Sequence, residues 1–490
     1  MSGLFDGPKE RPKGQNSREL AHTIGEDIMS GEVFATLNGS EEILVYKLGI
    51  YRRGGEFVIK ADVQKIALPE DLGNSLVSEV IGNVQRSTYV QVERFTEPTP
   101  NIVVENGLLN VETFALGPHT PDHYSLSGLP VKFDLNGTCP AFERFLPEVL
   151  YRDDIPIVQE WFGYCLHRGY PAQLAILFVG DGSNGKSTLI GVLKALLGFE
   201  NISSVSLQEL ELNRFAKADL FGKLANLYAD LPDSALKSIG TFKMLTGGDP
   251  IRGEKKFQDS FPFVNNAKLT FSCNVVPEVY EDTAAFFRRW IIIQFPHIFE
   301  GEKADKDLLK KLTTPEELSG ILNWALLGLK RLRENGWTFS NSRPTEELRL
   351  DYIRRSSPMK AFTMDVLTIN TRGRVPKKSL YQAFAKYCEK NKLPLVTEAT
   401  FFRNLPMYFA SNPLQESREE IGGNRVRCFL GIEIRPEEEW GKPKSDSDES
   451  REGEDHGHGG QDGQDRLDSG HEVHDVQGPP DHSLEDSDGK

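Results

Sequence analysis

The chain lacks several features that would place it in a large class of proteins. No run of 18 or more apolar residues occurs in its 490 residues, and its N-terminal stretch is polar, which argues against a membrane span or a secretory signal. Only five cysteines occur, without a C-x-x-C pair, so neither a zinc site nor a disulfide framework is indicated. We expect a soluble multidomain protein in a cytoplasm-like compartment, with no membrane partner.

A surplus of basic residues is also absent, because the formal net charge is −15. The residues from Gly441 onward hold 15 acidic and 5 basic side chains, a net charge of −10, which leaves −5 for residues 1–440. Residues 437–490 have almost no large apolar side chains to offset their ordering entropy, so we expect a disordered acidic tail. The five histidines of this tail lack ligand spacing and favour a solvated segment over a metal site.

Residues 175–197 contain the most informative pattern. Five apolar residues precede a glycine-rich loop, and apolar residues at helical spacing follow it. The loop fits G-x-x-x-x-G-K-[ST], in which glycines let backbone N–H groups face phosphate oxygens and the helix N-terminus adds its dipole. Lys186 would reach the β- and γ-phosphates of ATP, and Ser187 would bind Mg²⁺. The expected nucleotide-binding residues are Gly180, Asp181, Gly182, Ser183, Asn184, Gly185, Lys186, Ser187 and Thr188.

Two later apolar segments each end in a polar candidate. Residues 224–229 predict a strand that ends at Asp230, where a P-loop NTPase holds the acid associated with Mg²⁺. Asp233 lies three residues further on, and the alternative is an ordinary turn aspartate. Residues 267–273 predict a strand that delivers Asn274 to the same edge of the sheet, a position that suits a sensor orienting the attacking water.

Basic residues mark two more candidate sites. Lys255 and Lys256 stand beside Phe257, and charges next to an aromatic ring on a loop suit a single-stranded nucleic-acid backbone, although a solvated hairpin is the alternative. Arg288 and Arg289 precede a fourth predicted strand. They could simply flank it, or one could be an arginine finger that acts on a neighbour's nucleotide.

The order of these motifs resembles the superfamily 3 helicase core of the phage-, plasmid- and poxvirus-type primase-helicases. The matching segments are GDGSNGKST, LANLYADLPD, MLTGGDPIRGEKKF, KLTFSCNVVPE and AFFRRWIIIQFP. Upstream, ILVYKLGIYRRG, CPAFERFLPEVL and QEWFGYCLHRG resemble the N-terminal domain of that family, so the resemblance covers residues 30–300. It implies an enzyme, an ATP-hydrolysing helicase that forms a ring, expected to be a hexamer, and moves 3′→5′ on single-stranded DNA.

The resemblance implies roles for the candidate residues and shows two departures. Asp230 would be the Walker B acid and Asn274 the sensor, Lys255 or Lys256 would track DNA, and Arg288 or Arg289 would be the trans-acting finger. Many relatives carry two adjacent acids in Walker B, whereas Ala229 precedes Asp230 here, which leaves open the carboxylate that activates water. The primase-polymerase domain of the family has no counterpart in the sequence, so the chain resembles the helicase part alone.

The expected fold class is α/β, with an AAA+-like P-loop NTPase core. We expect a flexible segment at 1–20, a mixed α/β domain at 21–138, the ATPase core with flanking helices at 139–340, a winged-helix domain at 345–436 and the disordered tail at 437–490. The winged helix rests on a helix at 378–392, a second helix opened by Thr397 and a hairpin around 422–424. A helix–hairpin packing module is the alternative.

The function that follows is a replicative DNA helicase of a virus, plasmid or provirus, in the cytoplasm of a prokaryotic or virus-infected host cell. Its expected partners are single-stranded and forked DNA, further copies of itself in a ring, and a separate primase or polymerase. One alternative is an ATP-switched initiator that assembles on DNA without processive unwinding. A second is a P-loop protein that acts on RNA or in packaging.

Overall fold

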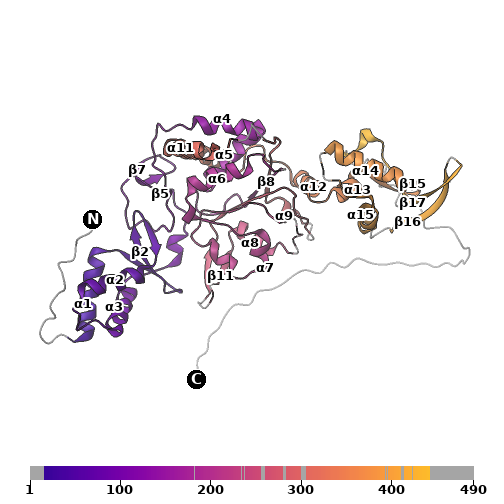
Figure 1. Ribbon diagram of the computed structural model, residues 1–490. Helices are drawn as coiled ribbons and strands as arrows, with labels where there is room; N and C mark the ends of the chain where they lie inside the picture. Colours follow the sequence, from indigo (N-terminus) through magenta and orange to yellow (C-terminus); the bar gives the residue numbers. More distant parts are fainter. Residues whose placement is uncertain are drawn as a thin grey trace, which may run out of the picture.

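The computed structural model describes residues 16–180, 182–232, 234, 236, 238–254, 256, 260–279, 283–299, 305–391, 393, 395–409, 413–421 and 423–441. A central unit lies between a smaller N-terminal unit and a smaller C-terminal unit (Figure 1). Among the helices of these described residues, none is long and apolar enough to cross a bilayer.

A five-stranded parallel sheet forms the centre of the fold. Its strands pair in the spatial order β14-β8-β13-β10-β9, and every pairing is parallel. They are β8 (Ala175–Val179), β9 (Ile202–Ser203), β10 (Ala225–Tyr228), β13 (Lys268–Cys273) and β14 (Trp290–Gln294). Continuous apolar runs such as β8 are typical of parallel strands that are covered on both faces. The strands predicted around the phosphate-loop motif are confirmed, as is a mixed α/β fold with a parallel sheet.

Alternate side chains of β8 enter two different cores, as strand geometry requires. Ile176 and Phe178 pack with the helices of one face, and Leu177 and Val179 pack with those of the other. The first face is covered by α4 (Pro140–Val149), α5 (Ile155–Tyr164), α6 (Lys186–Leu197) and α11 (Pro315–Glu334). The second is covered by α7 (Leu207–Leu212), α8 (Gly240–Gly247) and α9 (Ala284–Phe287), with the hairpin β11 (Pro250–Gly253) and β12 (Phe261–Val264) beside them (Figure 1).

The N-terminal unit is a four-stranded sheet of order β3-β2-β1-β4 with three helices on one face. Its elements are α1 (Ser17–Gly31), β1 (Phe34–Leu37), β2 (Ile43–Lys47), β3 (Ile50–Arg53), α2 (Gly55–Ile66), α3 (Asn74–Ser87) and β4 (Tyr89–Val90). A small sheet of β5 (Asn101–Val104), β6 (Gly107–Asn110) and β7 (Leu116–Gly117) follows. The other face of the four-stranded sheet packs on the central unit through Ala35, Leu37 and Leu44.

The prediction of a flexible segment at 1–20 is wrong for residues 17–20. These residues form the first turn of α1, because Asn16 and Glu19 make a reciprocal capping box. The Asn16 side chain accepts hydrogen bonds from the backbone N–H groups of Arg18 and Glu19, and Glu19 accepts from that of Asn16. Such a box satisfies donors that would otherwise lack partners at a helix start, so it fixes the helix boundary.

The C-terminal unit contains the elements predicted there. They are α13 (Pro358–Val366), β15 (Leu367–Pro376), α14 (Lys377–Asn391), α15 (Glu398–Asn404), β16 (Gln415–Ile421) and β17 (Asn424–Ile434), with sheet order β15-β17-β16. Thr397 caps α15 by accepting a hydrogen bond from the Thr400 N–H, as predicted. The expected tail begins too early, since Trp440 packs on Tyr387 and donates to the Arg435 carbonyl. Residues 442–490 of that predicted tail lie outside the described residues.

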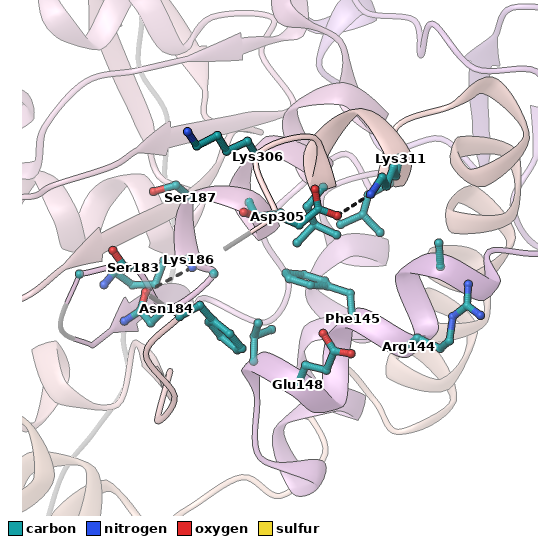
Figure 2. A pocket seen from close by; sticks show the side chains of 18 of the residues that line it. Arg144, Phe145, Glu148, Ser183, Asn184, Lys186, Ser187, Asp305, Lys306 and Lys311 are labelled. Atoms are coloured by element: carbon teal, nitrogen blue, oxygen red, sulfur yellow. Dashed lines mark hydrogen bonds and ion pairs between the residues drawn. The ribbon is translucent and has the colours of Figure 1, made fainter. Parts of the chain in front are cut away.

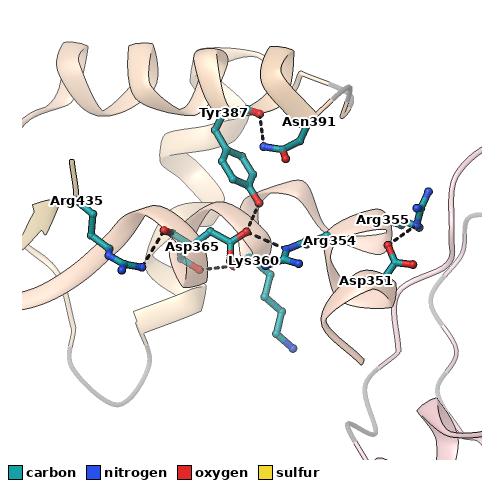
Figure 3. A network of polar contacts seen from close by, with 9 residues as sticks. Asp351, Arg354, Arg355, Lys360, Asp365, Tyr387, Asn391 and Arg435 are labelled. Atoms are coloured by element: carbon teal, nitrogen blue, oxygen red, sulfur yellow. Dashed lines mark hydrogen bonds and ion pairs between the residues drawn. The ribbon is translucent and has the colours of Figure 1, made fainter. Parts of the chain in front are cut away.

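Helix α12 (Thr345–Ser356) connects the central and C-terminal units. Its Tyr352 is buried against Phe286 and Phe287 of the central unit, so a domain boundary before residue 345 is wrong for this helix. The next residue but one, Arg354, donates two hydrogen bonds of 3.0 Å to the buried Asp365 carboxylate of α13 (Figure 3). Two positions of one helix, two residues apart, therefore contact two different units.

Candidate functional site

The loop between β8 and α6 has the geometry that its glycines predict. A Cβ at Gly180 would lie 2.4 Å from Asn184 Nδ2 and 2.7 Å from the Phe295 carbonyl oxygen, so a side chain does not fit. Gly185 has φ +92°, and a Cβ there would lie 2.6 Å from Val149. The Ser183 carbonyl accepts a hydrogen bond of 2.7 Å from the Phe299 N–H, which fastens the loop to the segment after β14. Because the loop is so tightly packed, only glycine fits at these two positions.

Lys186 begins α6 and connects the loop to the neighbouring strand. Its Nζ donates to the Gly180 carbonyl and, at 3.2 Å, to Asn274 Oδ1. Lys186 is 5% exposed, so both oxygens offset the cost of burying the ammonium. Lys186 and Asn274, chosen separately from the sequence, therefore lie side by side.

Four sequence-predicted residues from three segments line one cavity of about 650 Å³, namely Lys186, Ser187, Asp230 and Asn274. Asp230 has φ +59°, a left-handed conformation that aspartate tolerates better than most residues and that turns the chain at the end of β10. Gly182, Ser183, Asn184, Gly185 and Thr188 line the same cavity. The preceding residue of Asn274, Cys273, is buried, and burial raises the pKa of its thiol to about 12. That thiol is therefore protonated at neutral pH.

The far end of the cavity is built from residues that the sequence reading missed. Arg144, Phe145 and Glu148 of α4 face Lys311 of α10 (Leu308–Leu312) across it (Figure 2). Lys311 Nζ donates to Asp305 at 2.6 Å, and this hydrogen bond lowers the pKa of the Asp305 carboxyl. The polar residues on the side of α4 opposite its apolar stripe could have indicated this end of the cavity from the sequence. No sequence pattern indicates that α10, more than 150 residues later in the chain, lies opposite α4.

Several predicted site residues lie outside the described residues. They are Asp181, Asp233, Lys255 and Phe257. Their assignments stay predictions. Asp230 is therefore the described candidate for the Walker B acid, and Lys256 is the described candidate on the DNA-tracking hairpin.

The two adjacent arginines have different environments. Arg289 is 8% exposed, and its guanidinium donates to Thr246 Oγ1 at 3.1 Å and to the Ala285 carbonyl. Burial also lowers the pKa of Arg289. Arg288 is exposed and lines a second cavity of about 590 Å³ along the open edge of β14. Of the two candidates for an arginine finger, Arg289 is buried and hydrogen-bonded within its own chain, whereas Arg288 is exposed to solvent.

Arg288 cannot serve the phosphate loop of its own chain. It stands just before β14, whose Trp290 pairs with Ala175 and whose Gln294 pairs with Val179. The length of β8 therefore separates Arg288 from Gly180 by roughly 20 Å. Any contact between Arg288 and a nucleotide would have to involve a second copy of the chain.

A second exposed basic–aromatic pair, also missed, lies beside the β11–β12 hairpin. Arg214 and Phe215 follow α7, and the Arg214 guanidinium stacks 4.7 Å from the Phe215 ring centroid. Arg214 pairs with Glu254 at 3.3 Å, two residues before Lys256. Lys256 and Phe215 also line one shallow cavity of about 330 Å³. The rule that selected Lys255, Lys256 and Phe257 from the sequence applies equally to Arg214 and Phe215.

Comparison with known protein families gives two matches. Residues 15–151 match the family described as D5 N terminal like, and residues 178–289 match a family of unknown function, DUF5906. The second match spans the phosphate loop, Asp230, Asn274 and both arginines, but assigns no activity. The first covers the N-terminal unit and α4.

Among curated proteins, a candidate helicase of Acanthamoeba polyphaga mimivirus, L207/L206, is 25% identical over 270 residues. The match covers 49% of this chain and 27% of that protein, so the chain corresponds to about a quarter of its relative's length. Among solved structures, the apo C-terminal region of NrS-1 is 13% identical with a TM-score of 0.44, over 86% of this chain and 100% of that one. A structure of its residues 305–718 gives the same TM-score and identity, over 85% of this chain.

The D5-type N-terminal match and the similarity to a viral protein named as a helicase agree with the resemblance found in the sequence motifs. On this basis the chain is similar to phage and viral primase-helicases.

Proposed function

We propose that the chain is an ATP-dependent replicative DNA helicase of superfamily 3, which moves 3′→5′ on single-stranded DNA as a ring, expected to be a hexamer. The observation that carries this proposal is the convergence of Lys186, Ser187, Asp230 and Asn274 on one cavity at the carboxyl ends of three neighbouring parallel strands. Ligands of open α/β sheets bind at this edge. The strand order, with the loop-bearing β8 between β14 and β13, supports an AAA+-like P-loop core.

In this proposal the chain hydrolyses ATP by holding and neutralising the triphosphate. Lys186 leaves its contacts with the Gly180 carbonyl and Asn274 and takes up the β- and γ-phosphate oxygens. The backbone N–H groups at the start of α6 donate to the same anion. Asn274, released from Lys186, orients the water that attacks the γ-phosphate. The adenine base of ATP would lie at the far end of the cavity, among Arg144, Phe145, Glu148 and Lys311.

The residues fit a magnesium ion. The Ser187 hydroxyl and the Asp230 carboxylate line the same cavity, and Mg²⁺ in such sites takes few protein ligands, keeping waters and phosphate oxygens as the others. Clusters of three or more histidine, cysteine or carboxylate ligands are absent from the described residues, as this kind of site allows. When bound, the ion would supply charge neutralisation between the β- and γ-phosphates.

The DNA-binding part of the proposal rests on Lys256, Arg214 and Phe215. These residues surround one hairpin on the face of the sheet opposite α6, so DNA would be held away from the nucleotide. Lys255 and Phe257 belong to the same proposed surface. The helix, hairpin and capped α15 of the C-terminal unit support a winged helix, for which we propose a second contact with DNA.

The proposed partners are forked DNA, further copies of the chain in a ring, and a separate primase or polymerase. The proposed location is the cytoplasm of a prokaryotic or virus-infected cell. Arg288 supports the ring, because it is exposed and out of reach of its own loop. In a ring it would complete the neighbouring subunit's site.

The test measures ATP turnover by the full chain with single-stranded DNA, duplex DNA, RNA or no nucleic acid, and strand displacement on forks with a 3′ or a 5′ loading strand. We expect single-stranded DNA to stimulate ATP turnover, and strand displacement to occur only on the fork that has a 3′ loading strand. Lys186→Ala is the inactive control. Turnover without displacement on either fork would favour the ATP-switched initiator. Stimulation by RNA alone would reject a DNA motor.

A further inference from the structure

Asn274 is carried on a short exposed span between two buried anchors. Cys273, the last residue of β13, is fully buried and pairs with Val179 of β8. Val276, three residues later, is 1% exposed and belongs to the core on the face of the sheet opposite α6. Between them lie Asn274 and Val275, which are both exposed. The position of the Asn274 amide therefore depends on how firmly each end of this span is held.

Helix α12 holds the downstream end of the span. The Tyr352 hydroxyl donates a hydrogen bond of 3.0 Å to the carbonyl of Pro277, the residue after Val276, and Tyr352 and Pro277 are both buried. Burial, together with the neighbouring Cys273 thiol, raises the pKa of the Tyr352 hydroxyl well above its ordinary value. The hydroxyl therefore keeps its proton and is the donor. It lies near the upstream anchor of the span and bonds to the downstream one.

The ring that carries this hydroxyl is itself held in place. Tyr352 packs edge-on against Phe286 and Phe287 of α9, with 5.4 Å between ring centroids in each pair. One turn further along α12, the Arg355 guanidinium donates at 3.4 Å to Gln294 Oε1, at the end of β14. These contacts fasten α12 to the elements around the central sheet. A donor held in this way can fix the position of the group that it contacts.

We propose that Tyr352 is a positioning residue for ATP hydrolysis. By holding the Pro277 carbonyl, it fixes the end of the span that carries Asn274, and so keeps the Asn274 amide where it can orient the attacking water. The proposal rests on the proposed function, because it assigns a supporting group to the residue that orients water there. Tyr352 does not contact the nucleotide in this proposal, so its effect on hydrolysis passes through Asn274.

The test measures kcat for ATP, nucleotide affinity and urea unfolding for Tyr352→Phe, which keeps the ring and removes the hydroxyl. We expect kcat to fall roughly 10-fold and affinity for ATP to change by less than about 2-fold, because a small displacement of a group that orients a reactant is costly. In the Asn274→Ala background the same replacement should change kcat by less than about 2-fold, because the residue through which Tyr352 acts is gone. Single-turnover assays measure the slow variants.

Tyr51→Phe is the matched control. Tyr51, in β3 of the N-terminal unit, is also buried, and its hydroxyl also donates to a proline carbonyl, that of Pro121, at 2.9 Å. The two tyrosine variants should therefore lose a similar amount of stability in urea. A fall in kcat is expected for Tyr352→Phe and not for Tyr51→Phe, so loss of a buried hydroxyl alone does not account for it.

A wild-type kcat in Tyr352→Phe would overturn the proposal, because the hydroxyl would then be structural. Equal losses of kcat for Tyr352→Phe with and without Asn274→Ala would also overturn it, because Tyr352 would then act through another group. If wild type does not hydrolyse ATP, the proposed function itself fails, and a wild-type kcat in Asn274→Ala would reject the role of Asn274 in it. Wild type and Asn274→Ala alone therefore distinguish a failure of the proposed function from a failure of this proposal.

Discussion

Lys186 donates a hydrogen bond to Asn274 across neighbouring strands, with Nζ 3.2 Å from Oδ1. One residue begins the helix after β8 and the other follows β13, and these strands are hydrogen-bonded to each other. In the proposed mechanism this contact joins the group that would bind phosphate to the group that would position water. A phosphate that takes Lys186 away from Asn274 would free the amide to hold the attacking water.

Replacing Lys186 and replacing Asn274 should therefore change ATP turnover and nucleotide affinity in different ways. Lys186→Ala should reduce ATP turnover by roughly 100-fold or more and weaken nucleotide binding, because the cation next to the phosphates is lost. Asn274→Ala should lower kcat with a small change in nucleotide affinity, because only the attacking water loses its partner. Steady-state turnover and nucleotide titration measure both. Lys194→Ala, on the exposed side of α6, is the control and should behave as wild type.

Asp230→Asn should stop turnover while nucleotide binding without Mg²⁺ remains detectable, because the variant keeps the shape but loses the charge that holds the ion. A binding titration in the presence of a chelator and a turnover assay with Mg²⁺ measure the two effects. Asp233→Asn is the comparison, since both residues were candidates from the sequence. A larger loss of turnover in Asp233→Asn would show that Asp230 is the wrong carboxylate.

Much of the candidate site could be predicted because its signals are local. The apolar run of β8, the glycines of the loop and the helical spacing of α6 lie within 23 consecutive residues, and Asp230 and Asn274 each follow a recognisable strand. Strand order was not predictable in this way, because pairing of parallel strands depends on contacts between distant segments. The end of the cavity made by α4 and α10 could not be predicted from the sequence for the same reason.

Arg288 and Arg289 show the limit most clearly. They are the same residue type at adjacent positions before the same strand, so no sequence pattern separates them. What separates them is Thr246, a buried residue of α8 that accepts from Arg289, and the open edge of β14 next to Arg288. Similarly, the start of α12 reads as part of the C-terminal domain until Tyr352 is seen among the aromatic residues of the central unit.

The surface around Arg214 and Lys256 should bind single-stranded DNA through phosphates. Arg214→Ala and Lys256→Ala should each weaken DNA binding and reduce the dependence of affinity on salt by about one ion, while basal ATP turnover stays unchanged. Titrations with a labelled oligonucleotide at several salt concentrations measure this. Lys330→Ala, an exposed lysine of α11 on the other face, is the control. Equal salt dependence in all four proteins would mean that DNA is bound elsewhere.

Acid should destabilise the chain through His167. Burial, together with the nearby Lys268 and Arg333, lowers the pKa of His167 to about 3, and its ring packs against Trp337 in a tilted arrangement. Below its unfolded pKa of about 6.5 only the unfolded state takes up the proton, so stability is lost as pH falls from 6.5 toward 3, by at most about 1.4 kcal/mol per pH unit. Urea unfolding at about pH 7 and about pH 5 should show a smaller loss for His167→Gln than for wild type. His22→Gln, on the exposed face of α1, should leave the loss unchanged.

Single replacements of the two arginines should separate activity from stability. Arg288→Ala should unfold like wild type but lose ATP turnover, by roughly 10³-fold if it acts as a finger. Arg289→Ala should lower stability by about 1–3 kcal/mol, because the buried Thr246 hydroxyl loses a partner and a cavity remains. Unfolding and turnover measured on the same preparations decide this. A stable but inactive Arg289→Ala beside a fully active Arg288→Ala would reverse the assignment.

If Arg288 acts on the neighbouring subunit's nucleotide, two inactive variants should restore each other. A subunit with Arg288→Ala keeps an intact phosphate loop, and a subunit with Lys186→Ala keeps its arginine, so an interface between them in one orientation contains a complete site. Mixing the two should recover part of the turnover, and specific activity of wild type should rise with protein concentration where the ring assembles. Mixing Lys186→Ala with Asp230→Asn is the control, because both lesions lie in the same site and no interface is complete. Recovery of turnover in the control as well would mean that the recovery does not come from Arg288 completing the neighbouring subunit's site. Absence of recovery, with a specific activity independent of concentration, would show that each chain hydrolyses ATP alone and that Arg288 serves the edge of β14.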